Sequence, residues 1–513
     1  MFEGQPKGLW ALALANTGER FGYYTMLAVF TLFLQANFGF DEKLTSTIFS
    51  TFLGLVYFLP LVGGILADKF GYHKMVTIGI FIMFAGYVLL SLPLGKDSVA
   101  LIAMAAALVS ISLGTGLFKG NLQVMVGDLY NDPKYAQKRD SGFQLFYMAI
   151  NVGAMFAPTA AIKLMNWAQT SMGASEADSY HYAFAVACAS LIFSIAIYYA
   201  GMFTFRHVIG TKKNTDKKGE NAQVAPADEL SPAETKERIV CLCLVMAVVV
   251  FFWMAFHQNG LTLTYFADEF TSRSSEGVEA LAFNVWNLVC VIVMVYAGFS
   301  LFQGKTAQTK IISAIVFAAA LGIIIWQYMS QDGAVKVSAP IFQQFNPFYV
   351  VALTPISLAI FGALAKRGKE PSAPRKIAYG MIIAALGFVV MAVGSIGLPV
   401  PQMEMVDGEK VAMHVADVTP QLLIYTYLVL TFAELLLSPM GISFVSKVAP
   451  PHLKGMMMGG WFVATALGNQ LVMVGGFLWG GIPLWIVWTV FVVLCILSAI
   501  FMFAMMKRLE KVC

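Results

Sequence analysis

Charged side chains are scarce in this sequence. Asp, Glu, Lys and Arg together make up 12% of its 513 residues, about half the share found in an average soluble protein. Hydrophobic residues make up 58%, and the mean hydropathy is +0.73. This composition excludes an ordinary soluble protein and indicates a polytopic membrane protein whose surroundings are the lipid bilayer. We expect no nucleic-acid partner.

Cysteines are also few, and the six that are present lie mostly inside apolar segments. The pair Cys241 and Cys243 has no second cluster of Cys or His that would complete a metal site, so we expect packing roles and no metal. The sequence lacks a nucleotide-binding loop, a nucleophile and base constellation, and a soluble signalling domain. These absences argue against an enzyme; a membrane receptor without transport is kept as a remote alternative.

Fourteen apolar segments are long enough to cross a bilayer about 30 Å thick, which takes about 20 residues. They span 8–37, 44–68, 75–95, 98–128, 141–165, 179–205, 237–266, 279–303, 311–330, 346–365, 376–397, 420–446, 454–478 and 482–506. The segment that follows the short polar start, Met1–Lys7, is too long for a signal peptide and lacks a small-residue cleavage site, so we expect it to stay in the mature protein.

The basic residues favour one orientation of these segments. If the N-terminus is cytoplasmic, 25 of the 33 Lys and Arg fall on the cytoplasmic side and five on the outer side, while Arg20, Lys119 and Lys163 fall within segments. This bias satisfies the positive-inside rule. It predicts a multi-pass protein of a bacterial inner membrane with both termini in the cytoplasm.

Two charges interrupt the first apolar segment. Glu19 and Arg20 lie near its middle, where each ionised side chain costs about 2.5 to 3.5 kcal/mol. On a helix, Asn16, Tyr23 and Leu27 share their face. We expect this face to look inward, toward water or a partner, and to be functional.

The connection between the second and third segments is a tight, basic turn. It contains Gly64, Asp68, Lys69, Gly71 and Lys74, and this pattern is similar to a loop signature of the major facilitator superfamily. In that superfamily such residues pair across the cytoplasmic side and stabilise one state of alternating access, which implies a gating loop. A simple basic turn is the alternative.

A more specific resemblance lies in Glu19-Arg20-Phe21-x-Tyr23-Tyr24. It resembles the first-helix motif Glu-x-x-Glu-Arg-Phe-x-Tyr-Tyr of the proton-dependent oligopeptide transporter family, with Asn16 in place of the first Glu. The resemblance implies that this helix takes part in proton coupling and that Arg20 faces the substrate carboxylate. It leaves Glu19 as the surviving coupling carboxylate.

Two further motifs supply charges of opposite sign. Gly114-Thr-Gly-Leu-Phe-Lys119-Gly-Asn121 is similar to the family's fourth-helix motif, and Glu434-Leu-Leu-Leu-Ser438-Pro matches Glu-x-x-x-Ser-Pro of its tenth helix. The resemblance implies that Glu434 offsets the charge of Lys119. A lysine that snorkels to the membrane surface is the alternative.

The fifth and seventh helices carry the next matches. Phe146-Tyr147-Met-Ala-Ile-Asn151 is similar to Phe-Tyr-x-x-Ile-Asn of the family, although Tyr147 and Asn151 would also serve as interhelical hydrogen-bonding residues. In the seventh helix, His257 precedes Gln258 where the family has Glu, and Leu27 replaces the Arg that pairs with that Glu. We therefore expect an outer gate that differs from the Arg–Glu pair of the family. In it, His257 either takes part in proton transfer or stays neutral and hydrogen-bonded.

The match Phe342-Gln-Gln-Phe-Asn346-Pro resembles the family's eighth helix but comes only after two additional apolar segments. Bacterial relatives usually carry such a pair between the sixth and seventh helices, whereas here it follows the seventh. Near the end, Met456-Met-Met-Gly-Gly-Trp461-Phe is similar to Met-Met-Gly-x-Trp-Phe. Trp461 would wall a side-chain pocket, with plain packing as the alternative.

The resemblance implies an all-α polytopic membrane protein with the major facilitator superfamily fold: two six-helix bundles plus two extra transmembrane helices, fourteen in total. The parts are expected at 1–205 (N-terminal bundle), 206–236 (solvated, flexible cytoplasmic linker), 237–268 (first helix of the C-terminal bundle), 279–330 (extra helices) and 342–513 (remaining five helices).

The function implied is a proton-coupled symporter that imports di- and tripeptides by alternating access, with protons as the coupling ion, no cofactor, and a monomeric state. The expected proton-coupling residues are Glu19, Arg20 and His257. The expected substrate-binding residues are Arg20, Tyr23, Tyr24, Tyr57, Lys119, Asn121, Tyr147, Asn151, Gln258, Asn346, Glu434, Ser438 and Trp461. The alternative keeps the fold but carries another small anion or a modified peptide, with altered proton coupling.

Overall fold

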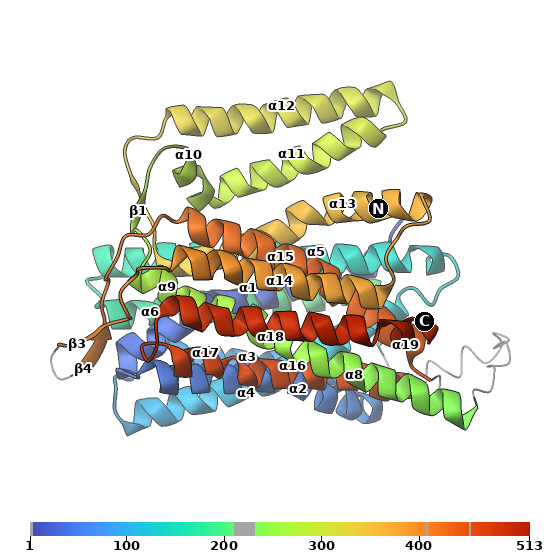
Figure 1. Ribbon diagram of the computed structural model, residues 1–513, viewed down its shortest axis with the longest axis horizontal. Coiled ribbons are helices and arrows are strands. Elements are labelled where there is room, and N and C mark those ends of the chain that lie inside the picture. The colour runs from blue at the N-terminus through green and yellow to red at the C-terminus, as the bar shows by residue number, and fades with distance from the viewer. Residues whose placement is uncertain (1–3, 210–230, 407–408, 451–452, 513) are drawn as a thin grey trace.

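The computed structural model describes residues 4–209, 231–406, 409–450 and 453–512 (Figure 1). Within these ranges, thirteen helical segments are long and apolar enough to cross a membrane. The first helix, α1, is not among them, but its 32 residues are also long enough. With α1, the fold has the fourteen spans that the sequence predicts.

The first six helices pack as one bundle. They are α1 (Lys7–Phe38), α2 (Glu42–Phe70), α3 (Tyr72–Ser91), α4 (Ser98–Asp128), α5 (Arg139–Ser171) and α6 (Glu176–Gly201). Within it, α1 packs on α5 and α6, and α4 packs on α2 and α3. Glycines allow the closest of these approaches, as small residues commonly do between membrane helices. Gly63 of α2, for example, lies directly against the backbone of Gly116 on α4.

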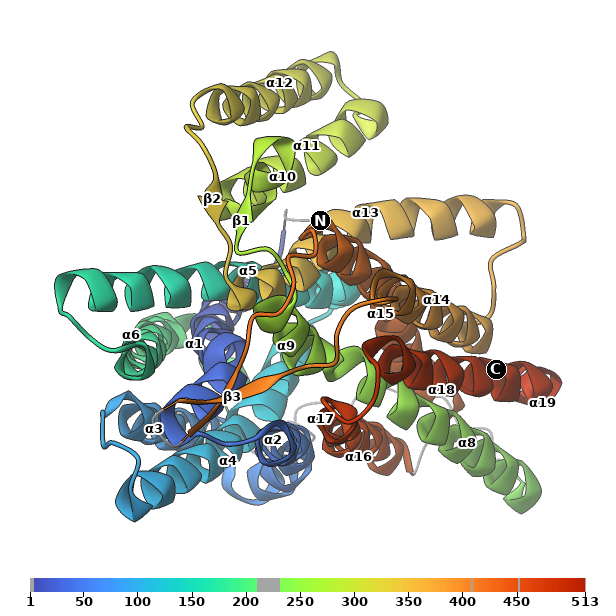
Figure 2. The ribbon, with the colours of Figure 1, turned by 60° about the vertical axis from the view of Figure 1, so that its left-hand side comes forward.

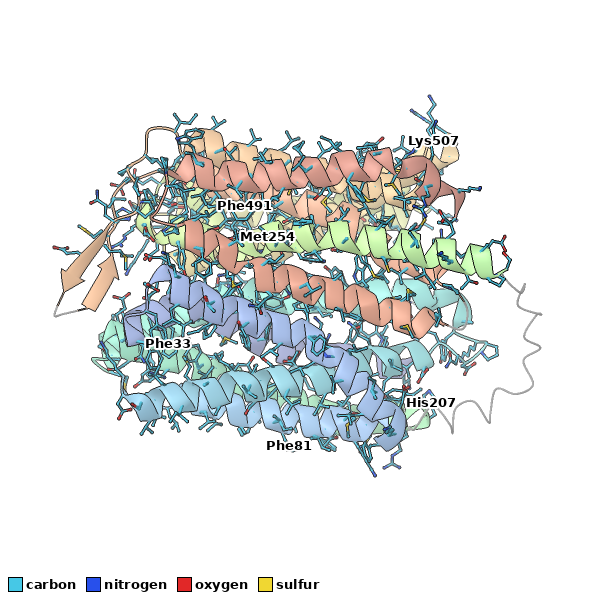
Figure 3. All side chains as sticks on the ribbon, turned by 60° about the horizontal axis from the view of Figure 1, so that its bottom comes forward. Phe33, Phe81, His207, Met254, Phe491 and Lys507 are labelled. Atoms are coloured by element: carbon cyan, nitrogen blue, oxygen red, sulfur yellow. The ribbon has the colours of Figure 1, made fainter. Side chains whose placement is uncertain are left out.

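The second bundle follows the linker, whose residues 210–230 lie outside the described ranges. Its elements are α8 (Pro232–Phe256), η4 (His257–Gly260), α9 (Thr262–Glu269), η6 (Ala339–Gln344), α13 (Phe345–Lys366), α14 (Ala373–Gly394), α15 (Gln421–Val448), α16 (Lys454–Leu471), α17 (Met473–Leu478), α18 (Leu484–Ala504) and α19 (Met506–Lys511). α8 begins ahead of the apolar segment expected at 237, because Ser231 and Glu234 form a capping box before it. Figure 3 shows α8 running into the molecule, with Met254 near the C-terminal end of the helix.

Two spans of this bundle are broken rather than continuous. The seventh span changes from α-helix to a 3-10 turn at His257 before α9 continues it, and the eleventh is interrupted at Val472, between α16 and α17. The two breaks are joined, because the Gln258 side chain donates a hydrogen bond to the Val472 carbonyl at 3.0 Å. Such breaks are tolerated at membrane depth when neighbouring side chains satisfy the freed backbone groups.

The extra helices α11 (Val285–Gln303) and α12 (Ala307–Met329) stand apart from both bundles (Figures 1 and 2). α11 contacts the core through the Tyr296 hydroxyl, which donates to the Val351 carbonyl of α13 at 3.2 Å. Trp286 of α11 also meets Phe156 of α5, with ring centroids 5.4 Å apart. α12 packs on α11 and is otherwise largely exposed. The pair therefore lies outside the twelve-helix core, and the predicted fold class is confirmed.

Short strands cover one end of the molecule. They are β1 (Ser274–Ser275) with β2 (Val335–Lys336), and β3 (Met403–Val406) with β4 (Glu409–Ala412). The chain after β4 is tied to the end of α9, where the Val415 amide donates to the Glu269 carbonyl at 2.8 Å. Contacts between the bundles lie at this end too: Gly476 packs on Ser46, and Gln343 donates to the Ala28 carbonyl at 3.3 Å.

Both chain termini lie at the opposite end (Figure 1). Gly8 packs against Leu129 and Phe205, while Glu510 accepts hydrogen bonds from Ser372 at 2.6 Å and Arg375 at 3.1 Å. The hydrogen bond from Ser372, followed by that from Arg375, lowers the pKa of the Glu510 carboxyl. The charged tail is therefore fixed to the start of α14.

The close approach of α2 and α4 can be tested with a pair of neighbouring glycines. A Cβ added at Gly63 would collide with the Gly116 carbonyl, so Gly63→Ala should force the helices apart and lower the free energy of unfolding by about 1 to 3 kcal/mol. The measurement is the melting temperature in detergent. Gly64→Ala is the matched control, because nothing lies within 4 Å of its added Cβ. Equal melting temperatures for the two variants would contradict the close approach.

Candidate functional site

The two charges of α1 pair with each other inside the first bundle. Glu19 is fully buried and Arg20 is 3% exposed. The Arg20 guanidinium donates two hydrogen bonds to the Glu19 carboxylate, both at 2.5 Å, and lies 4.5 Å from the centroid of the Tyr23 ring. A bidentate pair of this kind offsets the cost of burying two charges. Arg20 is thus occupied in this state, and a substrate carboxylate would have to compete with Glu19.

Lys119 of α4 lies over an aromatic ring. Its ammonium nitrogen is 4.2 Å from the centroid of the Tyr57 ring on α2, a cation–π contact. Among the described residues, no ion pair joins Lys119 to Glu434, so the expected pairing is wrong for this conformation. Lys119 lies in the first bundle and Glu434 in α15 of the second. In this conformation Lys119 contacts the Tyr57 ring, and Glu434 is hydrogen-bonded by Asn346.

Glu434 is held by neutral donors instead. The Asn346 side-chain amide donates to its carboxylate at 2.8 Å and to the Thr431 hydroxyl at 3.0 Å. Tyr147 of α5, in the other bundle, lies within electrostatic reach of the carboxylate. Asn151 holds Tyr147 in turn, since its amide donates to the Tyr147 carbonyl at 3.0 Å. Glu434 is therefore a buried acid with hydrogen bonds but without a counter-charge.

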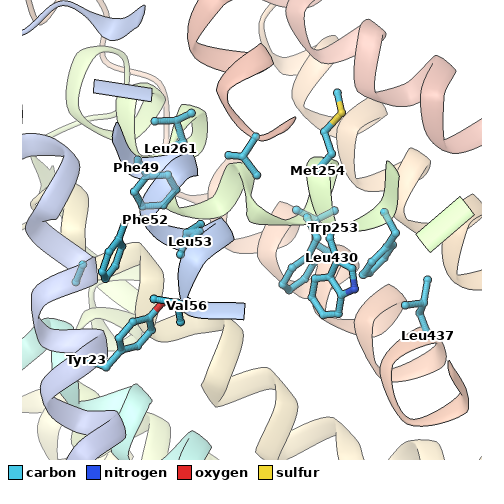
Figure 4. Packing of buried hydrophobic residues seen from close by; sticks show 14 of the residues in the cluster. Tyr23, Phe49, Phe52, Leu53, Val56, Trp253, Met254, Leu261, Leu430 and Leu437 are labelled. Carbon is cyan, nitrogen blue, oxygen red and sulfur yellow. The ribbon is translucent and has the colours of Figure 1, made fainter. Parts of the chain in front are cut away.

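The tyrosines fill the space between these charges. Tyr24 packs edge-on against Tyr23, with centroids 5.2 Å apart, and Tyr23 stacks on Phe52 at 6.2 Å (Figure 4). Tyr24 and Tyr57 each lie within the electrostatic reach of both Arg20 and Glu434. The structure thus gathers the predicted charges and tyrosines at the interface of the two bundles.

His257 lies at the break of the seventh span. Its ring stacks on that of Trp253 with centroids 5.1 Å apart and an interplanar angle of 18°. On its other side, the Tyr57 ring of the first bundle lies 6.0 Å away, and Asn469 of α16 faces the imidazole. The contact that His257 makes with the first bundle is therefore aromatic, and Leu27 of α1 carries no charge that could pair with it.

Other predicted site residues are engaged within one bundle. Gln258 is fully buried and bonds to Met254, Val472 and Thr262. Asn121 is 1% exposed and donates to the carbonyls of Gly63 and Leu117 at 3.2 and 2.7 Å. These contacts join helices, and in this conformation they do not bring either side chain to Glu434.

Two residues near the end of the predicted set are buried in the second bundle. The Trp461 indole, 3% exposed, lies directly against Gly441 of α15. The Ser438 hydroxyl is buried and has no hydrogen-bond partner among the described residues. Packing between α15 and α16 is thus the contact that the structure gives Trp461, and substrate contacts at both positions stay a prediction.

The predicted gating loop forms the turn from α2 to α3. Gly71 has φ of 97°, a left-handed value that favours glycine, and it both ends α2 and precedes α3. Asp68, Lys69 and Lys74 are exposed, and the Tyr72 hydroxyl donates to Asp68 at 3.1 Å. Of the two neighbouring glycines, Gly63 makes the close contact with α4, whereas nothing lies within 4 Å of a Cβ added at Gly64.

Sequence analysis missed two polar residues of the site. Thr431 precedes Glu434 by one helical turn on the same face, and its hydroxyl accepts a hydrogen bond from Asn346. Asn469 is fully buried beside His257. Both residues could have been found from the sequence, because each is a polar residue within an apolar segment, and such residues in membrane helices often have a function.

Comparisons with known proteins find relatives along most of the chain. The family model described as "POT family" matches residues 73–227 and 307–475. The uncharacterized transporter YclF of Bacillus subtilis is 29% identical over 92% of this chain and 87% of its own length. The peptide transporter YePEPT of Yersinia enterocolitica is 28% identical over 93% and 88%, and dipeptide and tripeptide permease A of Escherichia coli is 25% identical over 93% and 84%.

Solved structures share the fold at lower sequence identity. A peptide transporter POT in complex with sulfate has a TM-score of 0.72 and 22% identity, covering 100% of this chain and 96% of that one. A POT family transporter in complex with 5-aminolevulinic acid has a TM-score of 0.73 and 18% identity, covering 99% and 98%. The fold is therefore that of the major facilitator superfamily. Since the family model covers more than half of the chain, the protein belongs to the POT family of transporters, the proton-dependent oligopeptide transporter family that its motifs resemble.

Proposed function

We propose that the protein is a proton-coupled symporter that imports di- and tripeptides by alternating access. Family membership and the naming of relatives as dipeptide and tripeptide permeases support a peptide substrate. The observation that carries the proposal is a base and an acid, Lys119 and Glu434, that lie on opposite bundles without an ion pair between them. A zwitterionic peptide would supply the counter-charge that each of them lacks.

The chemistry of the site suits both ends of a peptide. The substrate ammonium would bind Glu434, whose present partners are neutral, and this acid favours a peptide over nitrate or another simple anion. The substrate carboxylate would bind Lys119 and Arg20. Tyr24, Tyr57, Tyr147, Asn151 and Asn346 would bind the peptide backbone between the two charges. Because the backbone is common to all peptides, such recognition leaves the choice of side chains broad.

The pairing of Glu19 with Arg20 suggests how a proton and a substrate are coupled. While Glu19 is ionised, it holds the Arg20 guanidinium through two hydrogen bonds. A proton on Glu19 removes the charge that holds Arg20, and Arg20 can then bind the substrate carboxylate. Proton and peptide would therefore favour each other's binding. His257 is the second candidate for proton transfer.

Alternating access requires each end of the bundle interface to open in turn. Contacts such as Gly476 on Ser46 close the end that carries the strands. We assign this end to the outside and the end with both termini and the linker at 206–236 to the cytoplasm, in line with the basic residues. The turn that contains Asp68, Lys69 and Lys74 would then act as a gate on the cytoplasmic side.

The energetics allow useful accumulation. One proton that moves down about 100 mV supplies roughly 2.3 kcal/mol. Since about 1.4 kcal/mol corresponds to a factor of ten, this energy would support roughly forty- to fifty-fold accumulation of a substrate.

The charge-pair mechanism predicts that Lys119→Ala and Glu434→Ala each reduce driven uptake of Ala-Ala into proteoliposomes to background, because one end of the zwitterion loses its counter-charge. The measurement is uptake of radiolabelled peptide under an inward proton gradient. Lys163→Ala is the matched control, since Lys163 also lies within a span but is exposed, and it should keep the uptake of the unmodified protein. Normal accumulation by either site variant would refute the mechanism.

The coupling mechanism predicts a different outcome for Glu19→Gln. The amide keeps hydrogen-bonding capacity but cannot release a proton, so the variant should retain counterflow exchange of Ala-Ala and lose accumulation driven by a pH gradient. Both are measured in the same proteoliposome preparation. If the variant still concentrates peptide under a pH gradient, Glu19 is not the coupling carboxylate and His257 becomes the next residue to substitute.

A further inference from the structure

A group of buried polar atoms beside the substrate site has no hydrogen-bond partner among the described residues. The atoms are Trp253 Nε1, His257 Nδ1, and both Nδ2 and Oδ1 of Asn469. Asn469 is fully buried and Trp253 is 9% exposed. Leaving such atoms unpaired costs free energy, and most buried polar atoms in native proteins are paired. Four of them in one place indicate a site for a bound group.

The broken helices bring these side chains together. Trp253 and His257 are one turn apart at the end of α8, and their rings stack at 5.1 Å. Asn469 comes from α16, which lies close to α8 because Gly468 has no side chain: a Cβ there would lie 2.7 Å from the Cβ of Trp253. Asn469 faces His257 within reach of a side-chain hydrogen bond, but no hydrogen bond of normal geometry pairs either atom of its amide among the described residues.

The group borders the substrate site of the first bundle. The Tyr57 ring lies 6.0 Å from the His257 ring, and the Lys119 ammonium lies 4.2 Å from the Tyr57 ring. Lys119 is also an electrostatic neighbour of His257. A ligand that binds between Lys119 and Glu434 would therefore have the unpaired atoms beside it.

The chemistry of these atoms favours a ligand rich in acceptors. The Trp253 indole can only donate, the Asn469 amide nitrogen donates, and Lys119 adds positive charge nearby. A carboxylate matches such a set of donors. The proposed function assigns the terminal carboxylate of a peptide to Lys119 and Arg20, which leaves an acceptor on a peptide side chain for these donors. Among side-chain acceptors a carboxylate forms the strongest hydrogen bonds.

We propose that Trp253, His257 and Asn469 form a specificity subsite for the side-chain carboxylate of an Asp or Glu residue in the transported peptide. This inference rests on the proposed function. It adds a preference to a site whose backbone recognition would otherwise accept most side chains.

The test compares peptides that differ only in side-chain charge. Ala-Glu and Glu-Ala, against Ala-Gln and Gln-Ala, compete with radiolabelled Ala-Ala for uptake into proteoliposomes. We expect the better acidic isomer to inhibit at a concentration about tenfold lower than its amide counterpart. Asn469→Leu and Trp253→Phe should each bring this ratio close to one. Because both peptides are measured on the same variant, a general loss of folded protein does not change the ratio.

Asn37→Leu is the matched control. Asn37 is also buried, at 3% exposure, but its amide donates to the Gly95 carbonyl at 3.2 Å, away from the site, so the acidic preference should persist. A ratio near one in the unmodified protein would overturn the proposal and would mean that the group holds water only. A tenfold ratio that survives both site variants would overturn it as well, by placing the preference elsewhere. Absence of Ala-Ala uptake would instead refute the proposed function itself.

Discussion

The site is organised by the high cost of an unpaired charge inside the membrane. Four charged groups, Glu19, Arg20, Lys119 and Glu434, lie within spans and are gathered near the interface of the two bundles, whereas Lys163, also within a span, is exposed. Two of them neutralise each other at 2.5 Å within one helix. The other two are stabilised by an aromatic ring and by neutral hydrogen bonds, which offset desolvation less completely than an ion pair of good geometry. In the proposed function, this incomplete compensation leaves binding energy for a zwitterion.

The breaks in the seventh and eleventh spans matter for the same reason. A continuous helix satisfies its own backbone, whereas a break releases carbonyls that need a donor. At the second break the Val472 carbonyl accepts from the Gly475 amide at 3.1 Å and also from the Gln258 side chain at 3.0 Å, so the fully buried Gln258 ties the two breaks together. The broken spans thereby hold His257 and Asn469 at the interface in a fixed position.

Much of this could be predicted from the sequence, because hydropathy and the placement of basic residues depend on the membrane alone. The fourteen spans, the position of the extra pair and the inward face of α1 followed from those patterns and from motif resemblance. The partners of the charges could not be predicted. Motifs indicate which residues belong to a site, but they do not state which conformation is populated, and Lys119 and Glu434 meet only if the bundles bring them together. Gln258 and Asn121 show the same limit, since a polar side chain in an apolar span can either bind a ligand or join two helices.

Asn16 stands where the family motif has a carboxylate. In the proposed mechanism, proton coupling on this face of α1 therefore depends on one pair, Glu19 and Arg20. If two carboxylates lay on this face, either could hold Arg20 while the other carried a proton, and proton binding would not need to release the guanidinium. With a single carboxylate, the same group must do both: Glu19 cannot take up a proton without weakening its hold on Arg20. Protonation and release of the carboxylate-binding residue then become one event. The loss of the second acid would therefore tighten the link between proton and substrate instead of weakening it.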